Sequence, residues 1–214
     1  MKKVILFDYD DTLVQTKQCK FQAVKALGKR YYKMEITDEQ LEEYWGIPYR
    51  NFFANLFGHI ENNLERVLTR YEALDDEFPM LVYPDFWDNF SYLCENYLLG
   101  IVTSAGRNLL YQQLAQLKIP TEKFSLLQAS DDTEFHKPDS RVFEPTLKYF
   151  KELGYEASDI TYVGDSLKDY YAARDAGFHF LGILRGTTSE NTFNKEGAEC
   201  IRTLAELKEK VSSN

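Results

Sequence analysis

Three aspartates lie close together near the start of the chain, at Asp8, Asp10 and Asp11. They directly follow the apolar run Val4–Phe7, which is typical of a buried strand. Residues two apart in an extended segment point to the same face, so Asp8 and Asp10 are expected to project together. One carboxylate can act as a nucleophile and the other as a proton donor, with a divalent cation limiting their repulsion. The alternative is an ordinary acidic turn after an edge strand.

Polar residues also stand at the ends of two later apolar runs. Thr103 and Ser104 close the second run, and their hydroxyls together with turn amides could bind an anion. A plain strand-to-helix turn explains this piece equally well. Lys137 stands before a proline in the loop after the third run. It could supply a fixed cation for a phosphoryl group, or lie as solvated surface.

Asp165 and Asp169 follow the fourth apolar run. They are four residues apart in a predicted helix, which places them on one helical face. The alternative is capping of a helix N-terminus by acidic residues. The carboxyl ends of parallel strands meet at the edge of the sheet where ligands bind, so we expect all these polar groups to cluster.

Two regions of different pattern must position these groups. Residues 15–84 carry helical periodicity with no convincing strand, and Thr37 with Gln40 predicts a capping box. From residue 85 onward, helices and strands alternate, which is typical of βαβ units. We predict an α/β fold: a parallel five-stranded Rossmann-like sheet with helices on both faces, plus an inserted all-helical cap. The α/β catalytic core would comprise residues 1–14 and 85–214, the helical cap domain residues 15–84, and the strands residues 4–7, 99–103, 126–129, 160–163 and 180–184.

Composition narrows the class of protein. The net charge of −9 over 214 residues argues against a nucleic-acid polymer as partner. Cys19, Cys94 and Cys200 have no paired spacing, which indicates reduced thiols in a cytoplasmic protein. The run at residues 4–7 is too short for a signal peptide, and no stretch approaches the about 18 apolar residues of a membrane span. We expect a soluble protein with no membrane partner.

The polar pieces occur in the order DxDDT, a strand ending Thr-Ser, Lys-Pro and GDSxxD, each after a strand. This order resembles the four motifs of the haloacid dehalogenase (HAD) superfamily. Gly164–Gly177 is similar to that family's GDxxxDxxxAxxAG segment. The helical insert resembles the small cap of the phosphoglycolate-phosphatase-like branch, with Gly46-Ile47-Pro48 at its Gly-x-Pro. Tyr83-Pro84-Asp85 matches its Pro-Gly, with Asp85 where glycine is usual.

The resemblance implies roles for the matching residues. Asp8 would be the nucleophile that forms an aspartyl-phosphate, and Asp10 the general acid and base. Thr103, Ser104 and Lys137 would hold the phosphoryl oxygens. An aspartate two positions after the nucleophile implies a phosphatase or a mutase and excludes a dehalogenase.

The same resemblance implies a metal cofactor. Mg²⁺ would be held by Asp8, the Asp10 carbonyl and Asp165, with Asp169 in or near the set of ligands. The leading hypothesis is a Mg²⁺-dependent phosphatase of small phosphorylated metabolites. Alternatives are a sugar-phosphate mutase, a nucleotidase or pyrophosphatase, and a non-catalytic relative that binds a phosphometabolite.

The first helix of the insert carries Lys17 and Lys20 on an otherwise apolar stripe. They are expected to contact an anionic or polar part of the substrate, or else to reach past the helix start into solvent. In the mutases of the resembled branch a histidine occupies the position of Lys20, so this lysine favours release of phosphate to water. The aromatic residues of the insert are expected mainly to pack it, with stacking on a nucleobase as the alternative: Tyr44, Trp45, Tyr49, Phe52 and Phe53.

Overall fold

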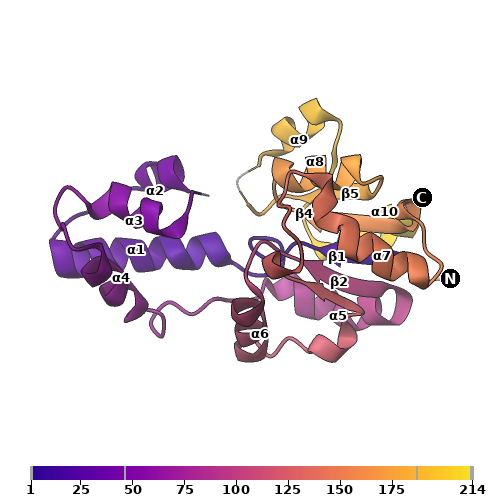
Figure 1. Ribbon diagram of the computed structural model, residues 1–214, viewed down its shortest axis with the longest axis horizontal. Coiled ribbons are helices and arrows are strands. Elements are labelled where there is room, and N and C mark those ends of the chain that lie inside the picture. The colour runs from indigo at the N-terminus through magenta and orange to yellow at the C-terminus, as the bar shows by residue number, and fades with distance from the viewer. Residues whose placement is uncertain (1, 46, 187, 213–214) are drawn as a thin grey trace. The chain divides into compact units, whose positions relative to one another are not determined.

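The computed structural model describes residues 2–45, 47–186 and 188–212, and Figure 1 shows their helices and strands. The chain divides into two compact units. We call Met1–Gln15 with Val82–Asn214 the core unit, and Thr16–Leu81 the helical unit. Gly46, the first residue of the predicted Gly-x-Pro break, lies outside the described residues.

The core unit is built on one parallel sheet, as predicted. In the described part of the chain the sheet has six strands and not the expected five: β1 (Val4–Phe7), β2 (Leu98–Val102), β3 (Leu126–Gln128), β4 (Ile160–Gly164), β5 (His179–Ile183) and β6 (Glu199–Ile201). The extra strand, β6, is three residues long and lies at the edge of the sheet. β3 is equally short, but β6 begins with Glu199 and lacks the apolar pair Leu126-Leu127 that marks β3 in the sequence.

The strand order is β3-β2-β1-β4-β5-β6, which places β1 between β2 and β4. From β1 the chain continues to β2 and β3 on one side of the sheet, and from β4 it continues to β5 and β6 on the other side. The position between β1 and β4 is therefore the topological switch point of a Rossmann-like fold. Val4 pairs with both Leu98 and Ile160, and Phe7 with both Ile101 and Val163. The carboxyl ends of β1, β2 and β4 therefore lie next to one another.

Helices cover the sheet of the core unit: α5 (Pro84–Asn96), α6 (Arg107–Gln116), α7 (Glu144–Glu152), α8 (Leu167–Asp175), α9 (Glu190–Glu196) and α10 (Leu207–Ser212). Val4 and Leu6 of β1 pack with Phe150 of α7 and Ala172 of α8. Alternation along β1 turns its other side chains to the opposite face, where they are also fully buried. The α/β class with a helix-flanked parallel sheet is thus confirmed.

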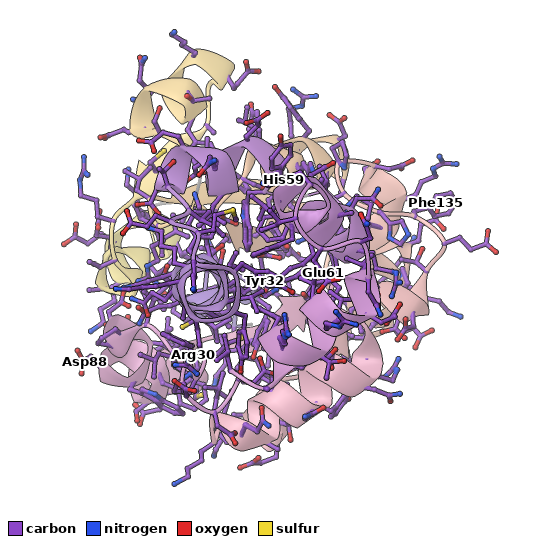
Figure 2. All side chains as sticks on the ribbon, turned by 90° about the vertical axis from the view of Figure 1, so that its left-hand side faces the viewer. Arg30, Tyr32, His59, Glu61, Asp88 and Phe135 are labelled. Carbon is purple, nitrogen blue, oxygen red and sulfur yellow. The ribbon has the colours of Figure 1, made fainter. Side chains whose placement is uncertain are left out.

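The helical unit contains four helices in its described part: α1 (Thr16–Tyr32), α2 (Asp38–Tyr44), α3 (Tyr49–Phe57) and α4 (Leu64–Glu72). Thr37 caps α2 and forms the predicted capping box with Gln40. Of the aromatic residues expected to pack the insert, Phe52 and Phe53 are buried in one apolar cluster and Tyr44 and Trp45 are partly buried against it, whereas Tyr49 is exposed. Tyr32, labelled in Figure 2, joins this cluster with its ring centroid 5.1 Å from that of Phe57. No helix among the described residues is long and apolar enough to cross a bilayer.

Candidate active site

Asp8 follows the last residue of β1 and is almost fully buried in the core unit. Its backbone amide donates to the carbonyl of Val163 at 2.8 Å, which fixes the residue against the end of β4. The Lys137 ammonium donates to Asp8 Oδ1 at 2.6 Å. This lysine comes from the loop after β3, so the predicted cation does reach the carboxyl edge of the sheet.

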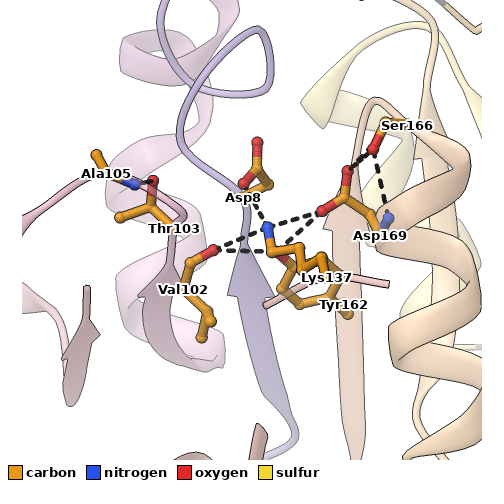
Figure 3. A network of polar contacts seen from close by, with 8 residues as sticks. All are labelled: Asp8, Val102, Thr103, Ala105, Lys137, Tyr162, Ser166 and Asp169. Atoms are coloured by element: carbon orange, nitrogen blue, oxygen red, sulfur yellow. Dashed lines mark hydrogen bonds and ion pairs between the residues drawn. The ribbon is translucent and has the colours of Figure 1, made fainter. Parts of the chain in front are cut away.

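Lys137 is the centre of a polar network drawn in Figure 3. Besides Asp8, its ammonium donates to Asp169 Oδ1 at 2.7 Å and to the Val102 carbonyl at 3.3 Å. The Tyr162 hydroxyl donates to the same carbonyl at 3.0 Å and lies 3.3 Å from Asp169 Oδ1. With a side chain only 5% exposed, Lys137 is fixed in position by three acceptors.

Asp169 reaches the network through a capping box at the start of α8. Ser166 is the N-cap, and its side chain accepts from the Asp169 amide while Asp169 Oδ2 accepts from the Ser166 amide at 3.1 Å. The expected placement of Asp165 and Asp169 on one helical face is wrong, because α8 begins only at Leu167. The turn between β4 and α8, and not helical periodicity, brings the two carboxylates together.

Asp165 lies directly after β4 and is buried. No described residue donates a hydrogen bond to its carboxylate. Gly186 in the loop after β5 backs onto this carboxylate so closely that a Cβ there would lie 1.6 Å from Asp165 Oδ2. A Cβ on Gly164 would likewise lie 2.6 Å from Asp169 Cβ. Both positions require glycine because backbone and carboxylate approach each other this closely.

The buried carboxylates carry more negative charge than Lys137 can balance. Burial, assisted by the charges of Asp169 and Asp10, raises the pKa of Asp8 to about 7 despite Lys137. Burial and the neighbouring carboxylates of Asp8 and Asp169 raise the pKa of Asp165 to about 9. Burial disfavours the charged form of Lys137, but the carboxylates of Asp169 and Asp8 outweigh it and hold its pKa well above the usual value. The cluster therefore lacks positive charge.

A divalent cation fits this cluster. Ligand oxygens of Asp8, Asp165 and Asp169 lie within 4.8 Å of one another. An all-carboxylate set of hard oxygen donors suits Mg²⁺. Asp165 has the fewest competing partners of the three, whereas both oxygens of Asp169 already accept hydrogen bonds within the network. The group of buried aspartates could thus hold a metal ion, with Asp8 and Asp165 as its best-placed ligands.

Asp10 lies in the loop between β1 and the helical unit. The extended run expected through Asp10 ends earlier, because β1 stops at Phe7 and Asp10 forms an isolated bridge with Val14. Its carboxylate lies outside the group of described residues whose ligand atoms converge. It is nevertheless close enough for its charge to raise the pKa of Asp8. Asp11 adopts a left-handed backbone conformation with φ of 54° and turns the chain there.

Thr103 and Ser104 occupy the loop after β2 as expected. Thr103 is buried, and its Oγ1 accepts from the Ala105 amide at 3.1 Å, so the hydroxyl caps a turn (Figure 3). A hydroxyl oxygen that accepts one bond can still donate its own hydrogen to an anion. Ser104 is exposed. Their role toward phosphoryl oxygens stays a prediction.

Lys17 and Lys20 both have contacts inside the helical unit. Lys17 forms an ion pair with Glu42 and lies over the ring of Phe21, 5.3 Å from its centroid. The Lys20 ammonium lies 5.8 Å from the ring centroid of Trp45. Whether either lysine also meets a substrate stays a prediction.

Two residues of the network were not recognised from the sequence. Tyr162 looks like an ordinary strand residue, yet its hydroxyl contacts both Val102 and Asp169. Ser166 stands in the sequence only as the serine of the GDSxxD motif. The one signal for Tyr162 is a tyrosine in an otherwise apolar buried strand, since a buried hydroxyl requires a partner.

The sequence matches one protein family and is similar to several named proteins. The family model described as "Haloacid dehalogenase-like hydrolase" matches residues 5–183. A Clostridium perfringens protein, provisionally named pyrophosphatase PpaX, is 28% identical over 86% of this chain and 84% of its own length. The glyceraldehyde 3-phosphate phosphatase of Methanopyrus kandleri is 27% identical over 87% of this chain and 85% of its own length.

Solved structures share the fold. A Thermotoga maritima protein, provisionally described as a beta-phosphoglucomutase, aligns over 99% of both chains with a TM-score of 0.82 at 18% identity. A Bacteroides fragilis protein, provisionally described as a haloacid dehalogenase-like hydrolase, aligns over 97% of this chain and 100% of its own, with a TM-score of 0.70 at 25% identity.

Proposed function

This chain belongs to the haloacid dehalogenase-like hydrolase family, and from that membership we propose that it is a Mg²⁺-dependent phosphatase of small phosphorylated metabolites. The observation that supports the proposal most is the pairing of Asp8 with Lys137 at 2.6 Å beside buried Asp165 and Asp169. Phosphoryl transfer requires charge neutralisation and fixed geometry around the phosphorus more than elaborate covalent chemistry. This arrangement can supply both.

The proposed reaction has two steps on Asp8. A carboxylate oxygen of Asp8 attacks phosphorus, the bond from phosphorus to the ester oxygen breaks, and Asp10 donates a proton to the departing oxygen. Asp10, now a carboxylate, takes a proton from a water molecule whose oxygen attacks the phosphorus of the aspartyl-phosphate. The bond between Asp8 and phosphorus then breaks, which returns the carboxylate and releases inorganic phosphate.

Lys137 and the loop after β2 would orient the phosphoryl group. Lys137 carries the positive charge, and Tyr162 and Asp169 hold its ammonium beside Asp8. Thr103 and Ser104 would donate hydrogen bonds to phosphoryl oxygens from the adjacent loop. All three ammonium hydrogens have acceptors in this structure, so a phosphoryl oxygen would take over one of these bonds.

Mg²⁺ would be held by Asp8, the Asp10 carbonyl and Asp165, with Asp169 beside them. When bound, it would neutralise the charge of the carboxylates and of the phosphoryl oxygens. The unmet negative charge around Asp165 supports this assignment.

Pyrophosphate is the second candidate substrate, because several relatives carry the name pyrophosphatase PpaX at 25–28% identity. A sugar-phosphate mutase and a nucleotidase are further alternatives, and Lys20 argues against the mutase.

A phosphate-release assay tests the proposal. We expect the purified protein to release phosphate from at least one small phosphorylated compound, among sugar phosphates, phosphoglycolate, nucleotides and pyrophosphate. Release should require Mg²⁺ and stop when EDTA removes the metal. Turnover that persists in metal-free buffer would contradict the assigned metal, and interconversion of sugar-phosphate isomers would favour the mutase.

The raised carboxyl pKa values predict how Mg²⁺ stabilises the protein. With pKa values of about 9 for Asp165 and about 7 for Asp8, the metal-free folded state keeps protons that the unfolded chain releases above about pH 4. The unfolding free energy contributed by these two groups therefore falls as pH rises from about 4 to the folded-state pKa of each group, about 7 for Asp8 and about 9 for Asp165. Mg²⁺ replaces the protons, so the increase in Tm that it causes should grow between about pH 6 and about pH 9.

Thermal unfolding with Mg²⁺ and with EDTA, at several pH values, measures this increase. Asp165→Asn should lose most of the pH-dependent part. Asp88→Asn, on the exposed surface of α5, should retain it. A magnesium effect that does not change with pH, or that survives in Asp165→Asn, would be inconsistent with the metal assignment.

A further inference from the structure

Arg185 is a buried arginine in the loop after β5, and its side chain is 7% exposed. One terminal nitrogen donates to the Thr12 carbonyl at 2.7 Å. The other forms an ion pair with Asp85, and the guanidinium lies 4.3 Å from the ring centroid of Tyr83. One side chain of the core unit thus contacts two segments that are far apart in the sequence, at residue 12 and at residues 83–85.

Thr12 belongs to the loop that carries the reacting aspartates. This loop runs from Asp8 to Val14, and its own hydrogen bonds include Leu13 N to Tyr9 O at 3.0 Å and Asp11 N to Val14 O at 2.8 Å. These bonds shape the loop, but they do not attach it to the β5 side of the sheet. The bond from Arg185 to the Thr12 carbonyl makes that attachment.

Tyr83 and Asp85 belong to the segment by which the chain returns to the core unit. The Tyr83 amide donates to the Leu13 carbonyl at 3.0 Å, and Val14 forms an antiparallel bridge with Val82. Asp85 also accepts from the Leu204 amide at 2.8 Å, which ties it to the C-terminal part of the fold. We call the loop from Asp8 to Val14 the catalytic loop. Arg185 therefore fixes this loop to the segment that holds Tyr83 and Asp85, through a planar group with several donors.

The residue after Arg185 is Gly186, whose backbone lies against the Asp165 carboxylate. Holding the loop at Arg185 therefore also holds the surface behind a proposed metal ligand. Arg185 and Gly186 together link both carboxylate-bearing ends, β1 and β4, to the loop after β5.

We propose that Arg185 is a positioning residue for the catalytic reaction: through Thr12, Asp85 and Tyr83 it fixes the loop from Asp8 to Val14 in its reactive geometry. This inference rests on the proposed phosphatase function. A buried ion pair by itself contributes little to stability, since desolvation offsets most of its attraction. Here the guanidinium also donates a hydrogen bond to the Thr12 carbonyl of the catalytic loop. This contact points to alignment of that loop as the function of Arg185.

The test compares Arg185→Met and Arg185→Lys with Arg174→Met. Arg174 has the same kinds of partner, Asp175 and the ring of Tyr171, but lies on the exposed end of α8. Steady-state kinetics with p-nitrophenyl phosphate and Mg²⁺ would give kcat and KM. Hydrogen exchange of peptides that cover residues 9–15, with α7 as an internal reference, would report on the loop without requiring turnover.

We expect Arg185→Met to lower kcat about tenfold or more, because small displacements of reacting groups are costly. KM should change only a few-fold, since Arg185 would not touch the substrate. Exchange in residues 9–15 should accelerate while α7 is unchanged. Arg185→Lys should recover little of the loss in kcat, because an ammonium cannot hold the carbonyl and the carboxylate as a guanidinium does. Arg174→Met should match the original protein.

Two results would overturn the inference: a lowered Tm with kcat within twofold of the original, or unchanged exchange in residues 9–15. If the unsubstituted protein hydrolyses no phosphoester, the proposed function fails separately. In that case faster exchange in Arg185→Met would still support the structural link, and unchanged exchange would remove it.

Discussion

Asp8→Asn is expected to abolish phosphate release while leaving the metal-free protein at least as stable as the original. The amide of asparagine cannot attack phosphorus, so no covalent intermediate would form. Burial makes the ionised form of Asp8 unfavourable, and the charges of Asp169 and Asp10 add to the effect. A neutral asparagine relieves that repulsion, and its amide oxygen can still accept from Lys137.

Phosphate release would be measured with Mg²⁺, and thermal unfolding with EDTA, on samples from the same preparation. Asp10→Asn provides the comparison, because loss of general acid–base catalysis costs typically about 10²–10⁴-fold while the nucleophile remains. With p-nitrophenyl phosphate, whose leaving group hardly needs a proton, Asp10→Asn should still release a first equivalent of nitrophenol faster than it turns over. Near-normal turnover in Asp8→Asn would refute the aspartyl-phosphate mechanism.

Lys137→Met is expected to damage both activity and stability. Removing the ammonium leaves Asp8 and Asp169 without their shared cation, and breaking a buried pair in this way costs about 3–5 kcal/mol of unfolding free energy. The loss should shrink at acidic pH, where the carboxylates can take up protons instead. Turnover should fall by about 10²-fold or more, as for other fixed groups that stabilise transition-state charge.

Lys148→Met, on the exposed surface of α7, is the matched control and should leave both properties unchanged. Urea unfolding at two pH values, followed by kinetics on the folded fraction, separates the two effects of Lys137. Stability within about 1 kcal/mol of the original would show that Lys137 does not compensate the carboxylates. Full turnover per folded molecule would remove it from the phosphate site.

Much of the fold follows from local patterns. The apolar runs predicted β1 to β5 closely, and the insert forms helices, as the helical periodicity of residues 15–84 indicates. Asp8 and Lys137 were predicted to meet because both follow parallel strands, and the topology alone brings such ends together. The residues that meet at the ends of parallel strands can therefore be predicted from the sequence even where the structure of the loops between the strands cannot.

What the sequence did not predict depends on contacts between distant residues. Arg185 is an isolated arginine in a loop, and nothing near it in the chain indicates that Thr12 and Asp85 would enclose it. The helix α9 and the strand β6 are short and packed at the edge of the sheet, where tertiary contacts decide their structure. Asp165 and Asp169 were expected on one face of a helix, but Ser166 caps α8 and bonds to Asp169, so Asp165 lies before the helix begins. A side-chain hydrogen bond at a helix start decides where the helix begins, and spacing in the sequence does not show it.

The central position of β1 has a consequence for how the chain folds during synthesis. β1 leaves the ribosome before its partners β2 and β4, so one of its edges stays unpaired until Leu98–Val102 has been made and the other until Ile160–Gly164 has been made. Contacts so distant in sequence form slowly, and unpaired strands are prone to aggregate. The helical unit is one continuous segment with its own apolar core, and can fold in the meantime. Gln15, just before the helical unit, donates a hydrogen bond to the carbonyl of Val82, just after it. Folding of the helical unit would therefore close a long loop early. It would also bring β1 close to the segment that leads into β2.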